Sequence, residues 1–204
     1  GKSLCYQIPA LMMRGVCIIV SPLLSLMKDQ ADALKKRGLK ARQLTSDNMP
    51  YGLAMALNSI ETTKTKFVFV SPERLQNKTF IDYVKSVKPC LFVVDEAHCI
   101  SEWGHDFRPE YRRIRPIVNE IGRAPIIALT ATATDKVRRD IKKSLGILKA
   151  QDFVSSFNRP NLYYEVRPKT KDIDKEIVRF IMQHAGKSGI VYCLSRKKVE
   201  GLAE

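Results

Sequence analysis

The sequence has no hydrophobic run long enough to cross a membrane and no closely spaced pair of cysteines. Its longest apolar runs, such as Val16–Val20 and Leu91–Val94, fall far short of the roughly 20 residues that a membrane-spanning helix needs. The five cysteines form no C-x-x-C pair, and two of them, Cys17 and Cys193, lie in apolar runs where we expect them to be buried. These absences predict a soluble protein without a disulfide framework or zinc site. They also predict a reducing intracellular compartment: cytoplasm or nucleoid, or nucleus in a eukaryote.

Acidic residues are in the minority. The chain of 204 residues has 21 Asp and Glu against 35 Lys and Arg, which gives a formal net charge of +14. The excess is spread along the chain, at +10 over residues 1–155 and +4 over residues 156–204. A solvated basic surface explains such a balance as well as a polyanionic partner does, but the balance favours a partner such as nucleic acid.

Short apolar runs alternate with helical patterns. Most of the runs are apolar throughout, which is typical of parallel strands that are covered on both faces. The expected strands are Val16–Val20, Phe67–Val70, Leu91–Val94, Ile126–Leu129, Leu162–Val166 and Ile190–Cys193. The expected helices are Leu4–Met13, Leu23–Arg37, Thr79–Val87, Lys136–Leu145 and Asp172–His184. This alternation predicts an α/β fold with a mostly parallel sheet.

A domain boundary is expected between residues 155 and 156. The helical pattern that ends near Gly146 gives way to a connector, and a new strand and helix follow. We therefore expect one domain over residues 1–155 and the beginning of a second over residues 156–204, with the chain cut at both ends.

Gly1-Lys2-Ser3 matches the end of the phosphate loop G-x-x-x-x-G-K-[ST] and is followed by a predicted helix. Backbone amides at a helix N-terminus bind phosphate oxygens, the lysine reaches the β- and γ-phosphates, and the serine ligates Mg²⁺. The tripeptide alone is a weak signal. A second copy at Gly186-Lys187-Ser188 follows a helix and precedes a strand, the reverse order, and is interpreted as a turn.

Asp95 and Glu96 follow an apolar strand directly, in the tetrapeptide D-E-A-H that ends at His98. Side chains at the carboxyl end of a parallel strand lie where α/β proteins bind ligands. Together with a phosphate loop, Asp95 is predicted to hold the Mg²⁺ shell and Glu96 to polarise the attacking water as general base. An acidic surface loop is the alternative for such a pair when it stands alone, and His98 alone is more often structural.

The segment Ala128–Thr134 follows another apolar run. Its hydroxyl groups are placed to bond the acidic loop and to sense the nucleotide. Helix capping by Thr132 or Thr134 is the alternative, and both interpretations are compatible.

The stretch Ser101–Tyr111 holds the only tryptophan, Trp103, close to other aromatic and basic residues. Such a mixture offers stacking platforms for unpaired bases. The alternative is a set of aromatic side chains folded back to anchor the loop.

These motifs, in this order, resemble the helicase core of superfamily 2. The resemblance rests on G-K-S, S-P-L-L-S-L-M-K-D-Q ending at Gln30, and S-P-E-R-L beginning at Ser71. Two further segments narrow the resemblance to the RecQ family of DNA helicases. They are D-E-A-H followed by C-I-S-E-W-G-H-D-F-R-P-E-Y, and A-L-T-A-T-A-T. The segments 156–161 and 189–200 continue the match.

The resemblance implies two RecA-like lobes that bind ATP and Mg²⁺, track single-stranded or tailed duplex DNA in the 3′→5′ direction and unwind it in DNA repair and recombination. It implies that the nucleotide is bound by Gly1, Lys2, Ser3, Asp95 and Glu96. Of these, Lys2, Asp95 and Glu96 would be catalytic. Ser3 would ligate the Mg²⁺ directly and Asp95 would hold it through water. It implies coupling by His98, Thr130 and Thr132, and DNA contacts by Gln30, Ser71, Arg74, Trp103, His105, Phe107 and Arg108. Gln30 and the Ser71–Arg74 segment are equally compatible with a structural role.

The resemblance also implies parts that these residues lack: the adenine-reading glutamine segment, the first half of the phosphate loop, the arginine finger and the accessory domains. We therefore expect residues 1–204 alone to hydrolyse ATP feebly and to unwind nothing, because an arginine finger contributes about 10³–10⁵ in rate. Three alternatives remain: another nucleic-acid-dependent ATPase of superfamily 2, such as an RNA unwinder or a translocase that does not unwind; a passive DNA-binding lobe; and a phosphate-loop kinase or transporter ATPase.

Overall fold

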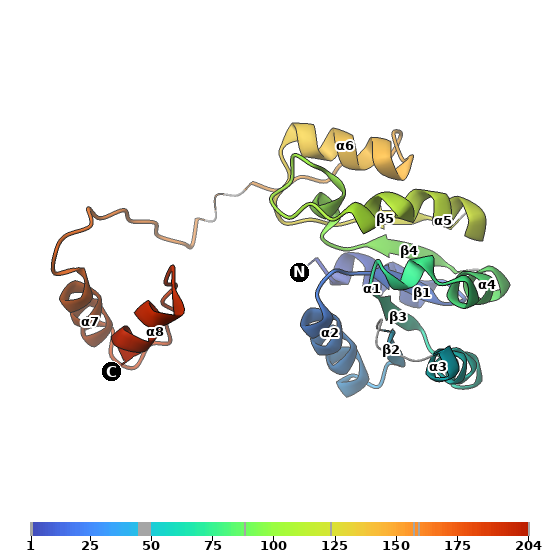
Figure 1. Cartoon of the computed structure of the whole chain (residues 1–204), viewed down its shortest axis with the longest axis horizontal. Coiled ribbons are helices and arrows are strands. Elements are labelled where there is room, and N and C mark those ends of the chain that lie inside the picture. The colour runs from blue at the N-terminus through green and yellow to red at the C-terminus, as the bar shows by residue number, and fades with distance from the viewer. Residues whose placement is uncertain are drawn as a thin grey trace. The chain divides into compact units, whose positions relative to one another are not determined.

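The computed structural model describes residues 2–44, 50–87, 89–122, 124–156, 158 and 160–203. The chain forms two compact units, Gly1–Asp152 (unit 1) and Phe153–Glu204 (unit 2), which Figure 1 colours by residue number. This division falls three residues before the boundary expected from the sequence. In the described residues, no helix is both long and apolar enough to cross a membrane.

Unit 1 is built on a parallel sheet of five strands in the order β2-β3-β1-β4-β5. The strands are β1 (Cys17–Val20), β2 (Ala41–Leu44), β3 (Phe67–Val70), β4 (Leu91–Val94) and β5 (Ile126–Ala128). Val20 is in register with Val70 on one side and Val94 on the other. The segments that follow β1, β3 and β4 therefore emerge at one edge of the sheet, where parallel α/β folds bind ligands.

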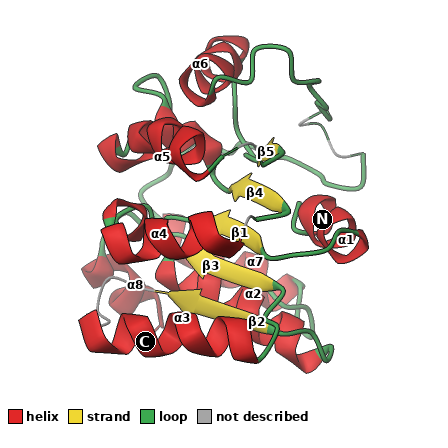
Figure 2. Cartoon of the chain, turned by 90° about the vertical axis from the view of Figure 1, so that its right-hand side faces the viewer, coloured by secondary structure: helices red, strands yellow, loops and turns green. Residues whose placement is uncertain are grey.

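Helices cover both faces of this sheet (Figure 2). On one face lie α1 (Leu4–Met12) and α2 (Leu24–Lys36); on the other lie α3 (Pro50–Thr62), α4 (Lys78–Val87), α5 (Ile114–Ile121) and α6 (Asp135–Leu145). Alternate residues of β1 enter the two cores, since Ile18 packs with α3–α6 and Ile19 packs with α1 and α2. Burial on both faces explains why the strand sequences are apolar throughout.

In unit 1 the elements expected from the sequence lie within one residue of their predicted ends. Three elements of unit 1 were not predicted from the sequence: β2, α3 and α5. Strand β2 is an edge strand with two half-buried polar residues, Arg42 and Gln43, at its centre. Helix α5 carries Pro116 in its first turn, where proline is tolerated but interrupts the helical pattern.

In unit 2 the expected helix is present as α7 (Ile173–Gln183), and α8 (Arg196–Ala203) is an additional helix. The strands expected at Leu162–Val166 and Ile190–Cys193 are wrong, because the described residues of both segments form no strand. A strand exists only when a neighbour pairs with its backbone, and no described segment of unit 2 pairs with either run. Cys17 is buried as expected, whereas Cys193 is only half-buried.

Candidate nucleotide and nucleic-acid site

The predicted phosphate loop lies at the start of α1. The carbonyl of Ser3 accepts hydrogen bonds from the amides of Tyr6 and Gln7 at 3.3 and 3.0 Å, so the helix begins directly after Ser3. The ammonium of Lys2 lies 3.1 Å from Oε1 of Glu96. Gly1 lies outside the described residues. The structure thus brings the lysine of one motif into contact with the carboxylate of another, 94 residues away.

Asp95 and Glu96 follow β4 at the carboxyl edge of the sheet. Asp95 is buried, with 5% of its surface exposed, and its Oδ1 accepts the amide of Glu96 at 3.0 Å. Burial raises the pKa of the Asp95 carboxyl group. Glu96 has a left-handed backbone with φ 46° and ψ 47°, a conformation that costs a non-glycine residue about 1–3 kcal/mol. This strained turn directs the Glu96 side chain toward both Lys2 and His98.

His98 is buried between the carboxylates and the aromatic stretch. Its Nδ1 lies 2.9 Å from Oγ1 of Thr130 and 3.3 Å from Oε2 of Glu96. Its ring stacks on that of His105, with ring centroids 4.1 Å apart. Burial and, secondly, the neighbouring His105 lower the pKa of His98, which keeps this imidazole neutral at pH 7.

Two threonines complete the contact with the aromatic stretch. The amide of Thr132 donates to Oγ1 of Thr130 at 3.3 Å, and Oγ1 of Thr132 lies 3.4 Å from Nδ1 of His105. The helix cap is Thr134, whose hydroxyl accepts the amide of Val137. Of the two threonines considered for capping, Thr134 therefore caps α6 and Thr132 faces the histidine.

The aromatic stretch folds back on itself before presenting its tryptophan. The amide of Gly104 donates to the carbonyl of Ser101 at 2.9 Å, and a Cβ atom at Gly104 would lie 2.4 Å from the carbonyl oxygen of His98. Trp103, at the tip, is 65% exposed. The ammonium of Lys136 lies 3.0 Å from the centroid of its ring, a cation–π contact.

Phe107 and Arg108 are held by the protein itself. Phe107 is half-buried beneath the guanidinium of Arg112, 5.1 Å from its ring centroid. Arg108 pairs with Asp106 at 3.2 Å and donates to the carbonyl of Pro22 at 3.3 Å. Phe107 and Arg108 thus contact the protein itself, as the anchoring interpretation expects, whereas Trp103 is largely exposed. The DNA contacts of all three residues stay predictions.

The other three residues predicted to contact DNA are Gln30, Ser71 and Arg74. The side chain of Gln30 accepts a hydrogen bond from the hydroxyl of Tyr6, and it also bonds the carboxyl group of Asp95. Ser71 and Arg74 are buried, with 2% and 6% of their surfaces exposed. These placements correspond to the structural alternative, and the DNA contacts of the three residues stay predictions.

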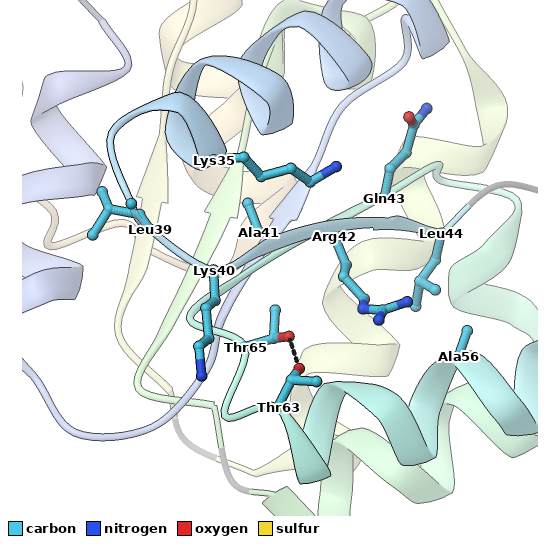
Figure 3. Close-up of a pocket in the computed structure, with 11 residues that line it drawn as sticks. Lys35, Leu39, Lys40, Ala41, Arg42, Gln43, Leu44, Ala56, Thr63 and Thr65 are labelled. Carbon is cyan, nitrogen blue, oxygen red and sulfur yellow. Dashed lines mark hydrogen bonds between the residues drawn. The ribbon is translucent and has the colours of Figure 1, made fainter.

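A depression of about 760 Å³ lies along edge strand β2 (Figure 3). Lys40 and Arg42 line it together with Thr63 and Thr65, whose hydroxyls are 2.9 Å apart. Two strands, β3 and β1, separate β2 from β4 and its carboxylates. The hollow is therefore not part of the site.

Two residues that support this site, Tyr111 and Lys136, were not predicted from the sequence. The buried hydroxyl of Tyr111 donates to the carbonyl of Asp95 at 3.0 Å and so fixes the backbone that carries the carboxylates. Lys136 contacts Trp103 from the first turn of α6. Neither contact has a signature in the sequence, because each joins residues that only the folded chain brings together.

A model of the family described as DEAD/DEAH box helicase matches residues 1–141. The chain belongs to this family. Its resemblance to the RecQ helicases is confirmed by curated relatives that match over its whole length. "ATP-dependent DNA helicase RecQ" of Haemophilus influenzae is 43% identical, and the protein of the same name from Bacillus subtilis is 42% identical. The chain covers 33% and 34% of these two relatives, so it spans about a third of their length.

Solved structures share the fold at low identity. The DUF1998 helicase MrfA, bound to DNA and AMPPNP, matches 99% of the chain and 31% of its own with a TM-score of 0.68 and 19% identity. The DEAD-box helicase Mss116, bound to ssRNA and UDP-BeF, matches 71% of the chain and 32% of its own with a TM-score of 0.54 and 21% identity. The expected α/β, RecA-like architecture is thereby confirmed for the sheet of unit 1.

Proposed function

We propose that this chain is part of the motor core of an ATP-dependent 3′→5′ DNA helicase of the RecQ type, which acts on single-stranded and tailed duplex DNA in repair and recombination. The observation that carries the proposal is a continuous series of contacts. It runs from Lys2 through Glu96 and His98 to His105, beside the exposed Trp103. These contacts would join a nucleotide at Lys2 to a base stacked near His105 through a few side chains.

The residues at the carboxyl edge suit a magnesium nucleotide. Ser3 offers a hydroxyl oxygen and Asp95 a carboxylate oxygen, and Mg²⁺ is usually held in proteins by one or two such groups together with phosphates and water. Lys2 would bind the β- and γ-phosphates, with the backbone at the start of α1. When bound, Mg²⁺ would neutralise charge that develops on the transferred phosphoryl group. A cation beside Asp95 would also favour the ionised form that burial disfavours.

Glu96 is the proposed general base. A carboxylate that orients and polarises the attacking water must lie near the phosphates, and contact with Lys2 places Glu96 there. A phosphate would compete with Glu96 for the Lys2 ammonium, which would weaken this ion pair and leave Glu96 freer to orient the water. Asp95 would hold the metal through water, fixed from behind by Tyr111.

His98, Thr130 and Thr132 are the proposed coupling residues. Neutral His98 faces Glu96 and Thr130 with the same Nδ1, so its hydrogen bond can pass from one to the other. His105 stacks on this ring and also faces Thr132. A displacement of the loop by DNA would therefore reach Glu96 through His98, which is how DNA would stimulate hydrolysis.

Trp103 is the proposed base-stacking platform, and Phe107, Arg108 and His105 would position its loop. We also propose that residues 156–204, which make up most of unit 2, are the beginning of a second RecA-like lobe. The match of the MrfA structure to 99% of the chain, which extends into unit 2, supports this proposal.

Strand separation with the full-length protein tests the helicase assignment. Duplexes with a 3′ or a 5′ single-stranded DNA tail are offered with ATP, and unwinding of the 3′-tailed substrate alone is expected. The same substrates with RNA tails are the comparison, and Glu96→Gln is the control for dependence on hydrolysis. Unwinding from RNA tails alone would contradict the proposal in favour of an RNA unwinder, and hydrolysis without any unwinding would favour a translocase.

A further inference from the structure

Helix α6 carries a row of basic residues on the face opposite its core. Val137, Ile141 and Leu145 are buried against the sheet. Lys136, Arg139 and Lys143 are exposed and spaced i, i+3, i+7, which places them together on the outward face. In the described part of the chain, no carboxylate lies within ion-pair distance of these three residues. The acidic residue of the first turn, Asp135, pairs instead with Arg138.

The row begins at the aromatic loop and ends at a fourth cation. At one end, the Lys136 ammonium lies over the exposed ring of Trp103. At the other end, the Arg115 guanidinium of α5 donates to the carbonyl of Lys143 at 3.2 Å. A Cβ atom at Gly146 would lie 2.8 Å from this guanidinium, so the absence of a side chain at Gly146 leaves room for Arg115 at the end of α6. Lys136, Arg139, Lys143 and Arg115 are called the α6 row below.

We infer that the α6 row binds the phosphate backbone of the nucleic acid strand whose base stacks on Trp103. This inference rests on the proposed function, which places a strand at Trp103, and adds a path along which the strand continues. Lys143 lies seven positions after Lys136 in the helix, a rise of about 10 Å at 1.5 Å per residue. A single strand spaces its phosphates at intervals of several ångströms, so this length accommodates about three of them.

The contact with Trp103 distinguishes the α6 row from an ordinary solvated charged face. Lys136 touches the ring on which a base would stack, so a nucleotide at Trp103 brings its phosphate to the beginning of the row. The row supplies charge without hydrogen-bond donors arranged for base edges, and it would therefore bind any sequence.

The salt dependence of DNA binding tests this inference in the full-length protein. Each lost phosphate contact to a single strand lowers the slope of log K against log[salt] by about 0.7. The triple variant Lys136→Gln, Arg139→Gln, Lys143→Gln is expected to reduce the slope by about 2. The double variant Arg139→Gln, Lys143→Gln keeps the contact of Lys136 with Trp103 and is expected to reduce it by about 1.4.

A matched control removes the same charge elsewhere. Lys36, Arg37 and Lys40 are exposed near the C-terminal end of α2, and their triple change to glutamine alters the net charge equally. The control is expected to change the slope by less than half as much as the α6 triple variant. Equal slopes for the two triple variants would overturn the inference, since only overall charge would then matter. Failure of the unsubstituted protein to bind single-stranded DNA would instead contradict the proposed function.

Discussion

The imidazole rings of His98 and His105 stack with their centroids 4.1 Å apart and their planes inclined by 21°. His98 belongs to the D-E-A-H segment and contacts Glu96, whereas His105 belongs to the loop that carries Trp103. This pair is therefore the shortest link between the proposed site of hydrolysis and the proposed site of base stacking. His98 is buried whereas His105 is exposed, so the stack joins a fixed ring to one that a bound strand can reach.

Replacing His105 by alanine is expected to lower the stimulation of ATP hydrolysis by DNA. The substitution removes the stack on His98 and the contact with Thr132 but leaves Lys2 and Glu96 in contact. The ratio of the ATPase rates with and without single-stranded DNA measures the effect. His105→Phe keeps a stacking ring and is expected to retain more stimulation than His105→Ala. Equal loss in both variants would show that the stack itself does not couple the sites.

Trp103→Ala is expected to weaken binding of single-stranded DNA by about 1–3 kcal/mol, the contribution of one stacked base. Phe107→Ala is expected to lower DNA-stimulated hydrolysis with a smaller effect on affinity, because Phe107 is half-buried under Arg112 and anchors the loop. Fluorescence anisotropy with labelled DNA measures affinity, and steady-state ATPase assays measure stimulation. Normal stimulation in both variants would restore a purely structural interpretation of the aromatic loop.

Asp95→Asn is expected to stabilise unit 1 against unfolding in the absence of nucleotide and Mg²⁺, by about 0.5–2 kcal/mol at pH 7. Burial raises the pKa of Asp95, so ionisation favours the unfolded state. The wild-type protein loses this stability as the pH rises from about 3.9, the unfolded value, through the raised pKa of the folded state. The variant retains the acceptor for the amide of Glu96 without the charge.

Urea denaturation of both proteins between pH 4 and pH 8 measures this difference. The advantage of Asp95→Asn should grow as the pH rises from about 4 to the raised pKa of folded Asp95 and then stay constant. Asp140→Asn, at a half-buried position of α6, is the control and should change stability by no more than about 0.5 kcal/mol. A variant less stable than wild type at pH 7 would show that the buried charge is compensated in the folded protein.

Gly104→Ala is expected to destabilise unit 1 by about 1–3 kcal/mol, the usual cost of overpacking. A Cβ atom there would lie 2.4 Å from the carbonyl oxygen of His98, and only movement of the loop relieves this contact. Gly189→Ala is the control, since a Cβ atom at Gly189 meets nothing within 4 Å. Thermal unfolding, together with DNA-stimulated ATPase, measures both consequences. Unchanged stability with normal stimulation would mean that the loop adapts freely.

The sequence alone was enough to predict the parallel α/β architecture and most elements of unit 1, because strands buried on both faces are apolar throughout. It also predicted that Lys2, Asp95 and Glu96 lie together, since the carboxyl ends of parallel strands meet at one edge. The strands expected in unit 2 were wrong because pairing, unlike hydrophobicity, depends on a neighbour that a local pattern does not supply.

The support around the site was not predictable in the same way. The hydrogen bond from Tyr111 to Asp95 spans 16 residues, and helix α5 and strand β5 lie between Trp103 and Lys136 along the chain. The burial of Ser71 and Arg74 is a property of packing and likewise has no local signature. The motifs therefore predicted the reacting groups but not the residues that hold them.

The most direct test of the proposed DNA-dependent motor is ATP hydrolysis by the full-length protein, with and without single-stranded DNA and beside Glu96→Gln. Strong stimulation by DNA is expected in the unsubstituted protein. In the variant, which loses the proposed base but keeps the phosphate-binding lysine and the aromatic loop, hydrolysis should be abolished while DNA binding persists. Hydrolysis that DNA does not stimulate would contradict a DNA-dependent motor, and hydrolysis that survives in Glu96→Gln would contradict the role of Glu96 as general base.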